Sequence, residues 1–323
     1  MIQKQGHWVP YELKPRDVER RFGTCELLLQ RQKRKGFLLS EMALETSTWL
    51  NQCFVENILR RLEDDNSIQV TNIFSKPATT KGDNYTSDMI RITTEYSRDQ
   101  NSYRIKEKKS IIFKILPELG SVIKSGLFHN EMSMMSNTLN KMNKLLEPKY
   151  RLSGKILYVQ NEDPMFLAIE DLASLGFRMA NRLSGLDLDH SILELHGLAR
   201  FHAASVALCE KEPKQKEMYS KGVDFQLCVY PSSALDLLFF LNTCSSLDVM
   251  ENKKNILLNE YFSTLLATMK ELNCKTPPPT MEELKATMKR KADYGMIIFF
   301  VVLPFMLCCK NEAKDLDELW SSY

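Results

Sequence analysis

The sequence predicts an α+β fold in two parts: a small β-sheet that carries one long helix, followed by a helical region. Three segments between residues 68 and 116 have the length and the apolar pattern of strands. From Phe128 to Leu146, apolar residues recur at spacings of three and four, which predicts the long helix. Beyond residue 186 the apolar spacing is mostly helical. A chain of 323 residues is long enough for two domains or one large two-lobed domain.

The composition is that of a globular protein, with 44% hydrophobic and 26% charged residues. A net charge of +2 gives no electrostatic reason to expect nucleic acid or a membrane surface as a partner of the whole chain. Eight scattered cysteines without a Cys-x-x-Cys pair indicate reduced thiols and a cytoplasmic location. The apolar run from Met296 to Cys309 contains Pro304 and is short for a membrane span, so we expect a buried core helix, with a membrane anchor as the alternative.

The first part of the chain differs from the rest because basic residues crowd between Lys14 and Lys35. They fit either a solvated basic helix or a nucleic-acid patch. Residues 2–38, which begin IQKQGHWVPYELKPRDVERRFG, resemble the segment of mariner transposases that leads into the catalytic domain. The sequence contains neither the helix-turn-helix units nor the carboxylate triad of that family. The resemblance therefore implies a captured fragment without transposase activity, and we expect residues 1–45 to form an extension rather than an independent domain.

The β-sheet part is predicted to start with a helix through Leu62, capped by Ser47 or Thr48. Residues 68–74 form a strand, residues 81–86 a turn, and the alternating Ile90, Ile92 and Tyr96 a half-buried strand. Backbone N–H groups in such a turn can donate hydrogen bonds to phosphate oxygens. With one glycine, Gly82, an ordinary β-turn is the other interpretation.

Lys114 lies within the apolar strand Ser110–Leu116, where an unpaired ammonium group would be costly to bury. It either extends to water from an edge strand or holds an anionic group such as a phosphate. Glu131 borders the apolar stripe of the long helix, so it can point toward the sheet and pair with Lys114 or lie in solvent. The sequence alone leaves both pairs of alternatives open.

Two strands, 155–159 and 165–169, precede Glu170-Asp171-Leu172, and the rest of the chain is mostly helical. A helix is predicted from about residue 186 to Leu208, with His190, His196 and His202 spaced six apart. This spacing does not place them on one face as metal ligands, so we expect structural roles. Further helices are predicted at 233–244 and around 256–272, and Thr280 with Glu283 forms a capping box for another.

Several segments together resemble insect ecdysteroid-kinase-like proteins of the choline-kinase-like (CHK) group. They are PATTKGDNYTSDM (77–89), IIFKILP (111–117), LFHNEMSMM (127–135), the long block 167–208 and VDFQLCVYPSSALDLLFFL (223–241). The resemblance implies a two-lobed protein-kinase-like fold, with residues 46–170 as the N-lobe and 171–323 as the helical C-lobe. It also implies ATP–Mg²⁺-dependent phosphorylation of a small-molecule hydroxyl, such as that of an ecdysteroid. A nucleotide and a small-molecule alcohol are then the expected partners.

The resemblance also implies roles for single residues. Lys114 would hold the α- and β-phosphates, and Glu131 would orient it. Gly82, Asp83 and Asn84 would belong to the turn that covers the phosphates. Glu170, Asp171 and Leu172 would form the crossover between the lobes beside the nucleotide base. Asp224, in an Asp-Phe-Gln triplet, would bind Mg²⁺, and Asp236 would be a structural carboxylate.

The sequence departs from the family at the catalytic loop. The family has a His-Gly-Asp…Asn loop before the Asp-Phe-Gln triplet, whereas here only Glu210–Val223 separates Cys209 from Asp224. This linker contains no His, Asp or Asn, so no residue is predicted as the catalytic base and the C-lobe is predicted to be partly deleted. Two hypotheses follow: a small-molecule kinase, or a catalytically dead pseudokinase or decayed fusion product.

Overall fold

The computed structural model describes residues 2–4, 7–9, 49–79, 87–116, 122–181, 183–214 and 233–307. The chain divides into two units, residues 1–47 and residues 48–323. In the first unit, β1 (Ile2–Lys4) and β2 (His7–Val9) pair as an antiparallel hairpin. The basic segment between Lys14 and Lys35 lies outside the described residues.

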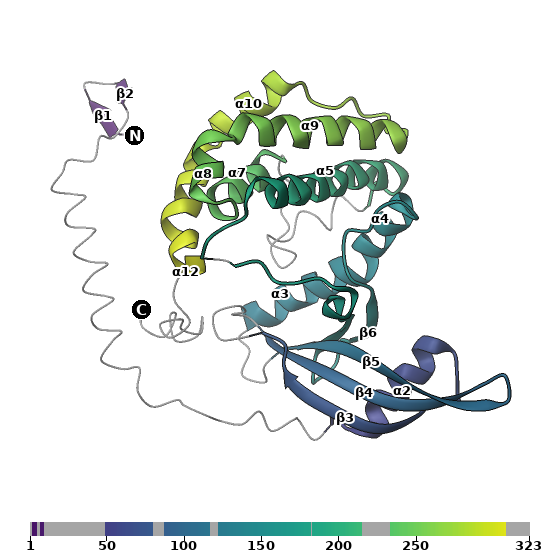
Figure 1. The fold of residues 1–323 in the computed structure, drawn as a ribbon. Coiled ribbons are helices and arrows are strands. Elements are labelled where there is room, and N and C mark those ends of the chain that lie inside the picture. Colours follow the sequence, from purple (N-terminus) through teal and green to yellow (C-terminus); the bar gives the residue numbers. More distant parts are fainter. Residues whose placement is uncertain are drawn as a thin grey trace, which may run out of the picture. The chain divides into compact units, whose positions relative to one another are not determined.

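The second unit contains a five-stranded antiparallel sheet in the order β3-β4-β5-β7-β6 (Figure 1). The strands are β3 (Gln69–Pro77), β4 (Asp88–Gln100), β5 (Tyr103–Ile115), β6 (Ile156–Gln160) and β7 (Phe166–Glu170). The sheet followed by a helical region confirms the predicted α+β, kinase-like fold.

Strand β5 starts earlier than predicted, so that β4 and β5 form a long hairpin. It closes at Asn101 and Ser102, whose φ angles of 50° and 68° are typical of a two-residue hairpin turn. The prediction started the second strand at Ser110, because residues 103–109 are mostly polar and carry no apolar alternation. In the structure these residues are exposed or half-buried, so pairing with β4 rather than burial fixes their strand conformation.

Helix α2 (Gln52–Glu63) covers one face of the sheet through Val55, Ile58 and Leu59, which are at most 2% exposed. The Asn51 side chain accepts a hydrogen bond from the Phe54 N–H at 3.0 Å and caps this helix. The predicted caps at Ser47 or Thr48 were therefore wrong. The helix starts later because Trp49 stacks on Phe166, with ring centroids 4.9 Å apart, and Leu50 enters the core before the first turn.

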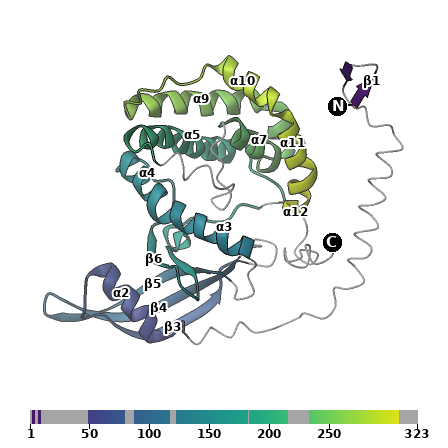
Figure 2. The ribbon, with the colours of Figure 1, turned by 180° about the vertical axis from the view of Figure 1, so that it is seen from behind.

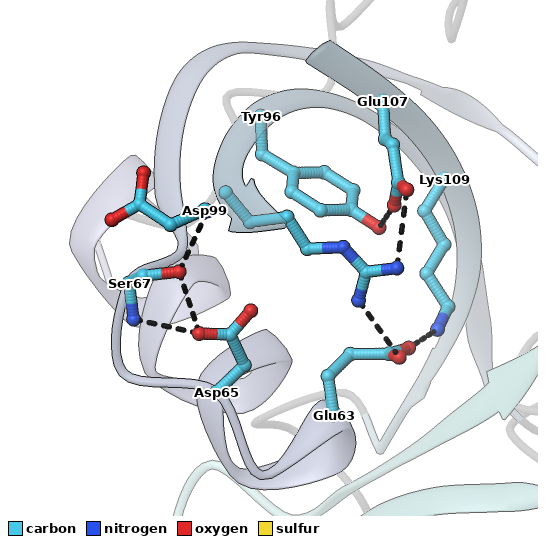
Figure 3. Close-up of polar contacts among 8 residues, drawn as sticks. Glu63, Asp65, Ser67, Tyr96, Asp99, Glu107 and Lys109 are labelled. Carbon is cyan, nitrogen blue, oxygen red and sulfur yellow. Dashed lines mark hydrogen bonds and ion pairs between the residues drawn. The ribbon is translucent and has the colours of Figure 1, made fainter. Parts of the chain in front are cut away.

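A network of polar side chains ties the end of α2 to the β4–β5 hairpin (Figure 3). Glu63 pairs with Lys109 and, at 3.5 Å, with Arg98, while the Tyr96 hydroxyl donates to Glu107 at 2.7 Å. The hydrogen bond from Lys109 lowers the pKa of Glu63, although partial burial opposes this shift. Within it, the two carboxylates of Glu63 and Glu107 balance the two cations of Arg98 and Lys109, so these four side chains offer no net charge to a ligand.

The other face of the sheet packs against a continuous helical segment. It consists of α3 (Val122–Ser133), a π-helical turn η1 (Met134–Thr138) and α4 (Leu139–Leu146). Phe128 and Met132 pack against Leu167 and Leu116 of the sheet. The predicted helix from Phe128 to Leu146 is confirmed, with a start six residues earlier than expected.

The helical region follows a short 3₁₀ turn, η2 (Leu172–Leu175). Its main helices are α5 (Leu188–Lys211), α7 (Ala234–Thr243), α8 (Leu247–Asn252), α9 (Lys254–Glu271) and α10 (Met281–Arg290). Figures 1 and 2, seen from opposite sides, both show α5 and α9 side by side. Their buried residues, among them Leu195 and Tyr261, share one core with those of α7 and α10.

Helix α4 joins the two parts of this unit by packing on α5. Met142 and Leu146 of α4 share a buried cluster with Ala204 and Leu208 of α5. At the edge of this contact Lys141 pairs with Glu212 at 2.6 Å. The helical segment from α3 to α4 is thus fixed at both ends: Phe128 packs against the sheet, and Met142 packs against the helical region.

The apolar run at the C-terminal end is not a buried core helix, so this prediction was wrong. It forms α11 (Ala292–Ile297), a π-helical turn η3 (Ile298–Val302) and α12 (Leu303–Leu307). Ile298 is buried, but Met296 and Phe300 are 59% and 70% exposed. Only one side of this segment packs on α7, where Gly295 approaches Leu238. Within the described ranges, no helix is both long and apolar enough to cross a membrane.

Candidate functional site

The centre of the candidate site is an ion pair between the sheet and the helix that covers it. Lys114 Nζ of β5 lies 2.5 Å from Glu131 Oε1 of α3. Both side chains are nearly buried, with 12% and 8% of their surface exposed. A charged pair in such a position is stabilised by mutual attraction but has lost most of its hydration. The structure therefore brings together the two residues that the sequence suggested as partners.

Local structure explains why the two side chains meet. Lys114 lies opposite Met89 on β4 and Leu167 on β7, in the middle of the sheet rather than at an edge. Glu131 lies next to Met132, whose side chain packs on Leu167. The apolar contacts of α3 with the sheet thus hold the carboxylate over the lysine. The edge-strand interpretation of Lys114 is excluded by its two neighbouring strands.

The crossover after β7 is anchored to the same face of the sheet by the carboxylate of Asp171. Arg91 of β4 donates to it twice, from Nε at 2.8 Å and from Nη2 at 3.2 Å. The Ser110 hydroxyl donates at 2.6 Å and the Ala173 N–H at 3.2 Å. Burial opposes ionisation, but these donors hold the pKa of Asp171 below its usual value. Four donors occupy both oxygens, so a ligand contact from the crossover has to come from other groups.

The neighbouring crossover residues, Glu170 and Leu172, differ in what they offer to a ligand. The Glu170 carboxylate accepts from the Lys155 N–H at 3.0 Å and pairs with Arg151 at 2.9 Å. It is therefore engaged in holding the segment before β6. Leu172 is the first residue of the 3₁₀ turn, a position whose N–H group has no partner within the helix. The N–H of Leu172 can thus donate a hydrogen bond to a ligand, whereas its carbonyl oxygen already accepts from the Phe177 N–H at 3.2 Å.

The sheet register places these residues in two adjacent rows. One row contains Arg91, Ile112 and Ile169, and the next contains Met89, Lys114 and Leu167. Side chains two residues apart on a strand share a face, so the Arg91–Asp171 contact and Lys114 lie on the same side of the sheet. Rows on one face are about 7 Å apart. The two cationic groups are therefore close neighbours on this face.

Several residues that the sequence singled out lie outside the described residues. They are the turn residues Gly82, Asp83 and Asn84 and the suggested metal ligand Asp224. Among the residues that the structure describes, no group of three His, Cys, Asp or Glu side chains could hold a metal ion. The role of Asp224 and the position of the turn stay predictions.

The three histidines of α5 make separate contacts with other residues. His190 bonds to its own N-cap residue Asp187 at 2.8 Å, and His196 bonds to Glu260 of α9 at 3.0 Å. His202 lies between two partners, with Nδ1 2.8 Å from the Tyr261 hydroxyl and Nε2 2.9 Å from Asp236. These bonds connect α5 to α7 and α9, so His202 and Asp236 have the geometry of structural residues.

Sequence reasoning missed Arg91 and Ser110, the two side chains that hold Asp171. Arg91 lies between Ile90 and Ile92, and it resembles any outward-facing residue of a half-buried strand. Its partner follows 80 positions later in the chain. Two features could have suggested the contact: a charged residue in the centre of a strand, and an acidic residue directly after the last strand of the sheet.

Comparison with known proteins supports this assignment of the fold. The sequence profile of the ecdysteroid kinase-like family matches residues 81–223 and residues 221–274. The two matched segments together cover more than half of the chain and include Lys114, Glu131 and Asp171. They meet at residues 221–223, where the sequence lacks the expected catalytic loop.

A second match concerns a different protein class. Over 37 residues the chain is 65% identical to the Mariner Mos1 transposase of Drosophila mauritiana. This stretch is 12% of the chain and only 11% of the transposase. Its length equals that of the resemblance noted for residues 2–38. The chain thus contains a transposase-like fragment beside the kinase-like region.

Proposed function

The chain belongs to the ecdysteroid kinase-like family, and from this premise we propose that it binds Mg²⁺–ATP between its sheet and the helical region. Kinase-like phosphotransferases of this family act on small molecules. We further propose that the acceptor is the hydroxyl group of a small molecule, such as an ecdysteroid. Lys114 holds the α- and β-phosphates, and Glu131 orients Lys114.

The observation that carries this proposal is the contact between Lys114 and Glu131. A buried ion pair is weak evidence for stability alone, because apolar side chains of similar size would serve as well. A lysine fixed by a carboxylate on the face of a sheet is, however, the arrangement that positions an ammonium group for phosphate oxygens. The contact supports the proposal because the carboxylate of Glu131 already orients the ammonium group of Lys114.

The described residues include a cation that can bind the phosphates, whereas the residue proposed to bind the metal lies outside them. Lys114 provides the cation for the phosphates, and the N–H of Leu172 provides a donor for the base. Asp224 is the residue we propose to hold Mg²⁺, which when bound would supply positive charge that neutralises the phosphates. Gly82, Asp83 and Asn84 are proposed to cover the phosphates.

A second candidate function is nucleotide binding without phosphoryl transfer. It is favoured by the linker Glu210–Val223, which contains none of the residues of a His-Gly-Asp…Asn loop. A general base contributes on the order of 10²–10⁴-fold to a reaction rate. Without it, a protein that still positions ATP would turn over at a small fraction of the rate of a complete kinase.

Thermal unfolding of the purified chain with and without Mg²⁺–ATP tests the binding step. We expect ATP to raise the unfolding temperature of the wild type, because a ligand that binds only the folded state stabilises it. Lys114→Ala and Asp224→Ala should diminish this shift, whereas Lys108→Ala on the exposed part of β5 should leave it intact. A folded wild type without any shift would reject the proposal.

Transfer of the γ-phosphate to a panel of steroid alcohols then separates the two candidate functions. If the wild type forms phosphorylated steroid and Lys114→Ala does not, kinase activity is established. An ATP-dependent thermal shift without any phosphorylated product, under conditions where a complete kinase of the family is active, would establish the non-catalytic nucleotide binder.

A further inference from the structure

Arg91 places a planar cation on the Lys114 face of the sheet, and the proposed phosphate contacts do not use it. Its Nε and Nη2 atoms bind Asp171, so the guanidinium group is fixed at 2.8 and 3.2 Å from the carboxylate. Its third nitrogen, Nη1, makes no hydrogen bond within the described ranges. In the same ranges, no aromatic ring stacks on the group. The side chain is 24% exposed.

The surroundings of this guanidinium group are suited to an aromatic ligand. Ile112, directly opposite Arg91 on β5, is 8% exposed, while Ile169 and Met89 on the two rows are only half-buried. Ile169 and the cation lie about one row, or 7 Å, from the row of Lys114, whereas Met89 lies directly opposite Lys114. The N–H of Leu172, the first residue of the 3₁₀ turn, follows directly after Asp171.

We propose that Arg91, held in place by Asp171, stacks on the base of the nucleotide whose phosphates bind Lys114. The inference rests on the proposed function and adds a specificity-determining residue to it. A guanidinium group attracts the face of an aromatic ring, and its flat shape matches the ring over its whole area. A lysine at this position would keep the charge and the contact to Asp171 but would lose the planar surface.

Asp171 is the positioning residue for this contact rather than a ligand of the nucleotide. Its oxygens also accept from Ser110 and the Ala173 N–H, so the carboxylate cannot turn away from Arg91 without breaking two other hydrogen bonds. This anchoring restricts the rotation of a long side chain before the ligand arrives. The Arg91 side chain therefore loses its conformational entropy during folding, and little further entropy is lost when the ligand binds.

Titration calorimetry with Mg²⁺–ATP and with Mg²⁺–tripolyphosphate separates the base contact from the phosphate contacts. In Arg91→Lys we expect the affinity for ATP to fall about 3- to 30-fold, the range of a stacking or cation–π contact. The affinity for tripolyphosphate, which has no base, should change by less than about twofold. Arg104→Lys is the matched control, because Arg104 pairs with Asp99 farther along the same two strands.

The outcomes are distinct. Equal losses for ATP and tripolyphosphate, or no loss for either, would overturn the base contact while the proposed function stands. A wild type that binds neither ligand would overturn both. If Arg91→Lys does not fold, Ser110→Ala replaces it, since it removes one donor to Asp171 and keeps both charges. The inference then requires a selective loss of ATP affinity of about 2- to 5-fold in Ser110→Ala, because the variant removes one of the hydrogen bonds that hold the Asp171 carboxylate against Arg91.

Discussion

Lys114 and Glu131 form the central ion pair of the candidate site, and because both side chains are nearly buried, they should contribute to stability in a way that can be measured. Removing one partner leaves the other charge in a nearly buried position, a change that costs more than breaking an exposed pair. We expect Lys114→Met to lower the free energy of unfolding by about 3 kcal/mol, measured by urea denaturation. The double variant Lys114→Met with Glu131→Gln should recover part of this loss.

Lys108→Met is the matched control for this prediction. Lys108 lies on the same face of β5 and pairs with Glu95 at 3.3 Å, but its side chain is 62% exposed. Its loss should cost less than about 1 kcal/mol. Equal effects of Lys114→Met and Lys108→Met would show that the buried pair has no special role.

Single residues of the candidate site were predictable where the signal was local. Lys114 was identified because a lysine within an apolar strand needs a partner, and Glu131 because it borders an apolar helical stripe. Local sequence features could single out Arg91 and Asp171 separately, but their pairing depends on the register of three strands and on a partner far away in the sequence. Charge alone does not reveal such a pair.

At the scale of elements, Glu210 at the end of α5 anchors the connection between α9 and α10. Its carboxylate accepts from the Lys275 N–H at 2.9 Å and the Thr276 N–H at 2.7 Å. These hydrogen bonds lower the pKa of Glu210 to about 2. A carboxylate with a lowered folded-state pKa stabilises the protein above its unfolded pKa, and this stabilisation is lost as the pH falls.

The pH dependence of Glu210→Gln tests this anchor. At pH 7 we expect the variant to unfold at a lower temperature than the wild type, because an uncharged amide oxygen is the weaker acceptor. Between about pH 4.5 and pH 2 the difference should shrink, as the wild-type carboxylate takes up a proton. A difference that stays constant over this range would contradict the role of the charge.

The N-terminus of helix α10 is a feature that the local sequence determines. The predicted capping box is confirmed: the Glu283 N–H donates to Thr280 Oγ1 at 3.1 Å, and the Thr280 N–H donates to Glu283 at 2.8 Å. By contrast, the extension of the β4–β5 hairpin and the cap of α2 depend on partners across the sheet. The reciprocal capping box of α10 was therefore predictable, whereas the start of α2 and the strand ends in polar sequence were not.

Loss of this cap should weaken α10 measurably. We expect Thr280→Ala to lower the free energy of unfolding by about 1 kcal/mol, because the Glu283 N–H loses its acceptor. Thr287→Ala, in the same helix, is the control and should cost less, since alanine suits a helix interior. Chemical denaturation of both variants measures the difference. If both cost the same, the capping box contributes nothing specific.

At the scale of the whole chain, the order of strands followed by helices was enough to predict an α+β fold, because the class depends on the sequence of elements. The kinase-like architecture followed from the resemblance of several segments to the ecdysteroid-kinase-like family. The burial of the segment after Met296 was not predictable. Its residues are as apolar as those of a core helix, yet Phe300 is 70% exposed. Burial depends on which elements pack on a helix, and composition does not specify them.

The two units of the chain lead to a last prediction, about the transposase-like fragment. Residues 1–47 form one unit and residues 48–323 the other, so the kinase-like unit should fold without the first. We expect deletion of residues 1–47 to leave the unfolding temperature and the ATP-dependent shift unchanged, as measured by calorimetry. Deletion of residues 1–55 is the control, because it also removes Trp49, Leu50 and Val55, which fill the core between α2 and the sheet. It should lower the unfolding temperature sharply. If the shorter deletion destabilises the chain as much as the longer one, the fragment has become part of the fold. Salt-dependent DNA binding that disappears with residues 1–47 would instead assign it a function of its own.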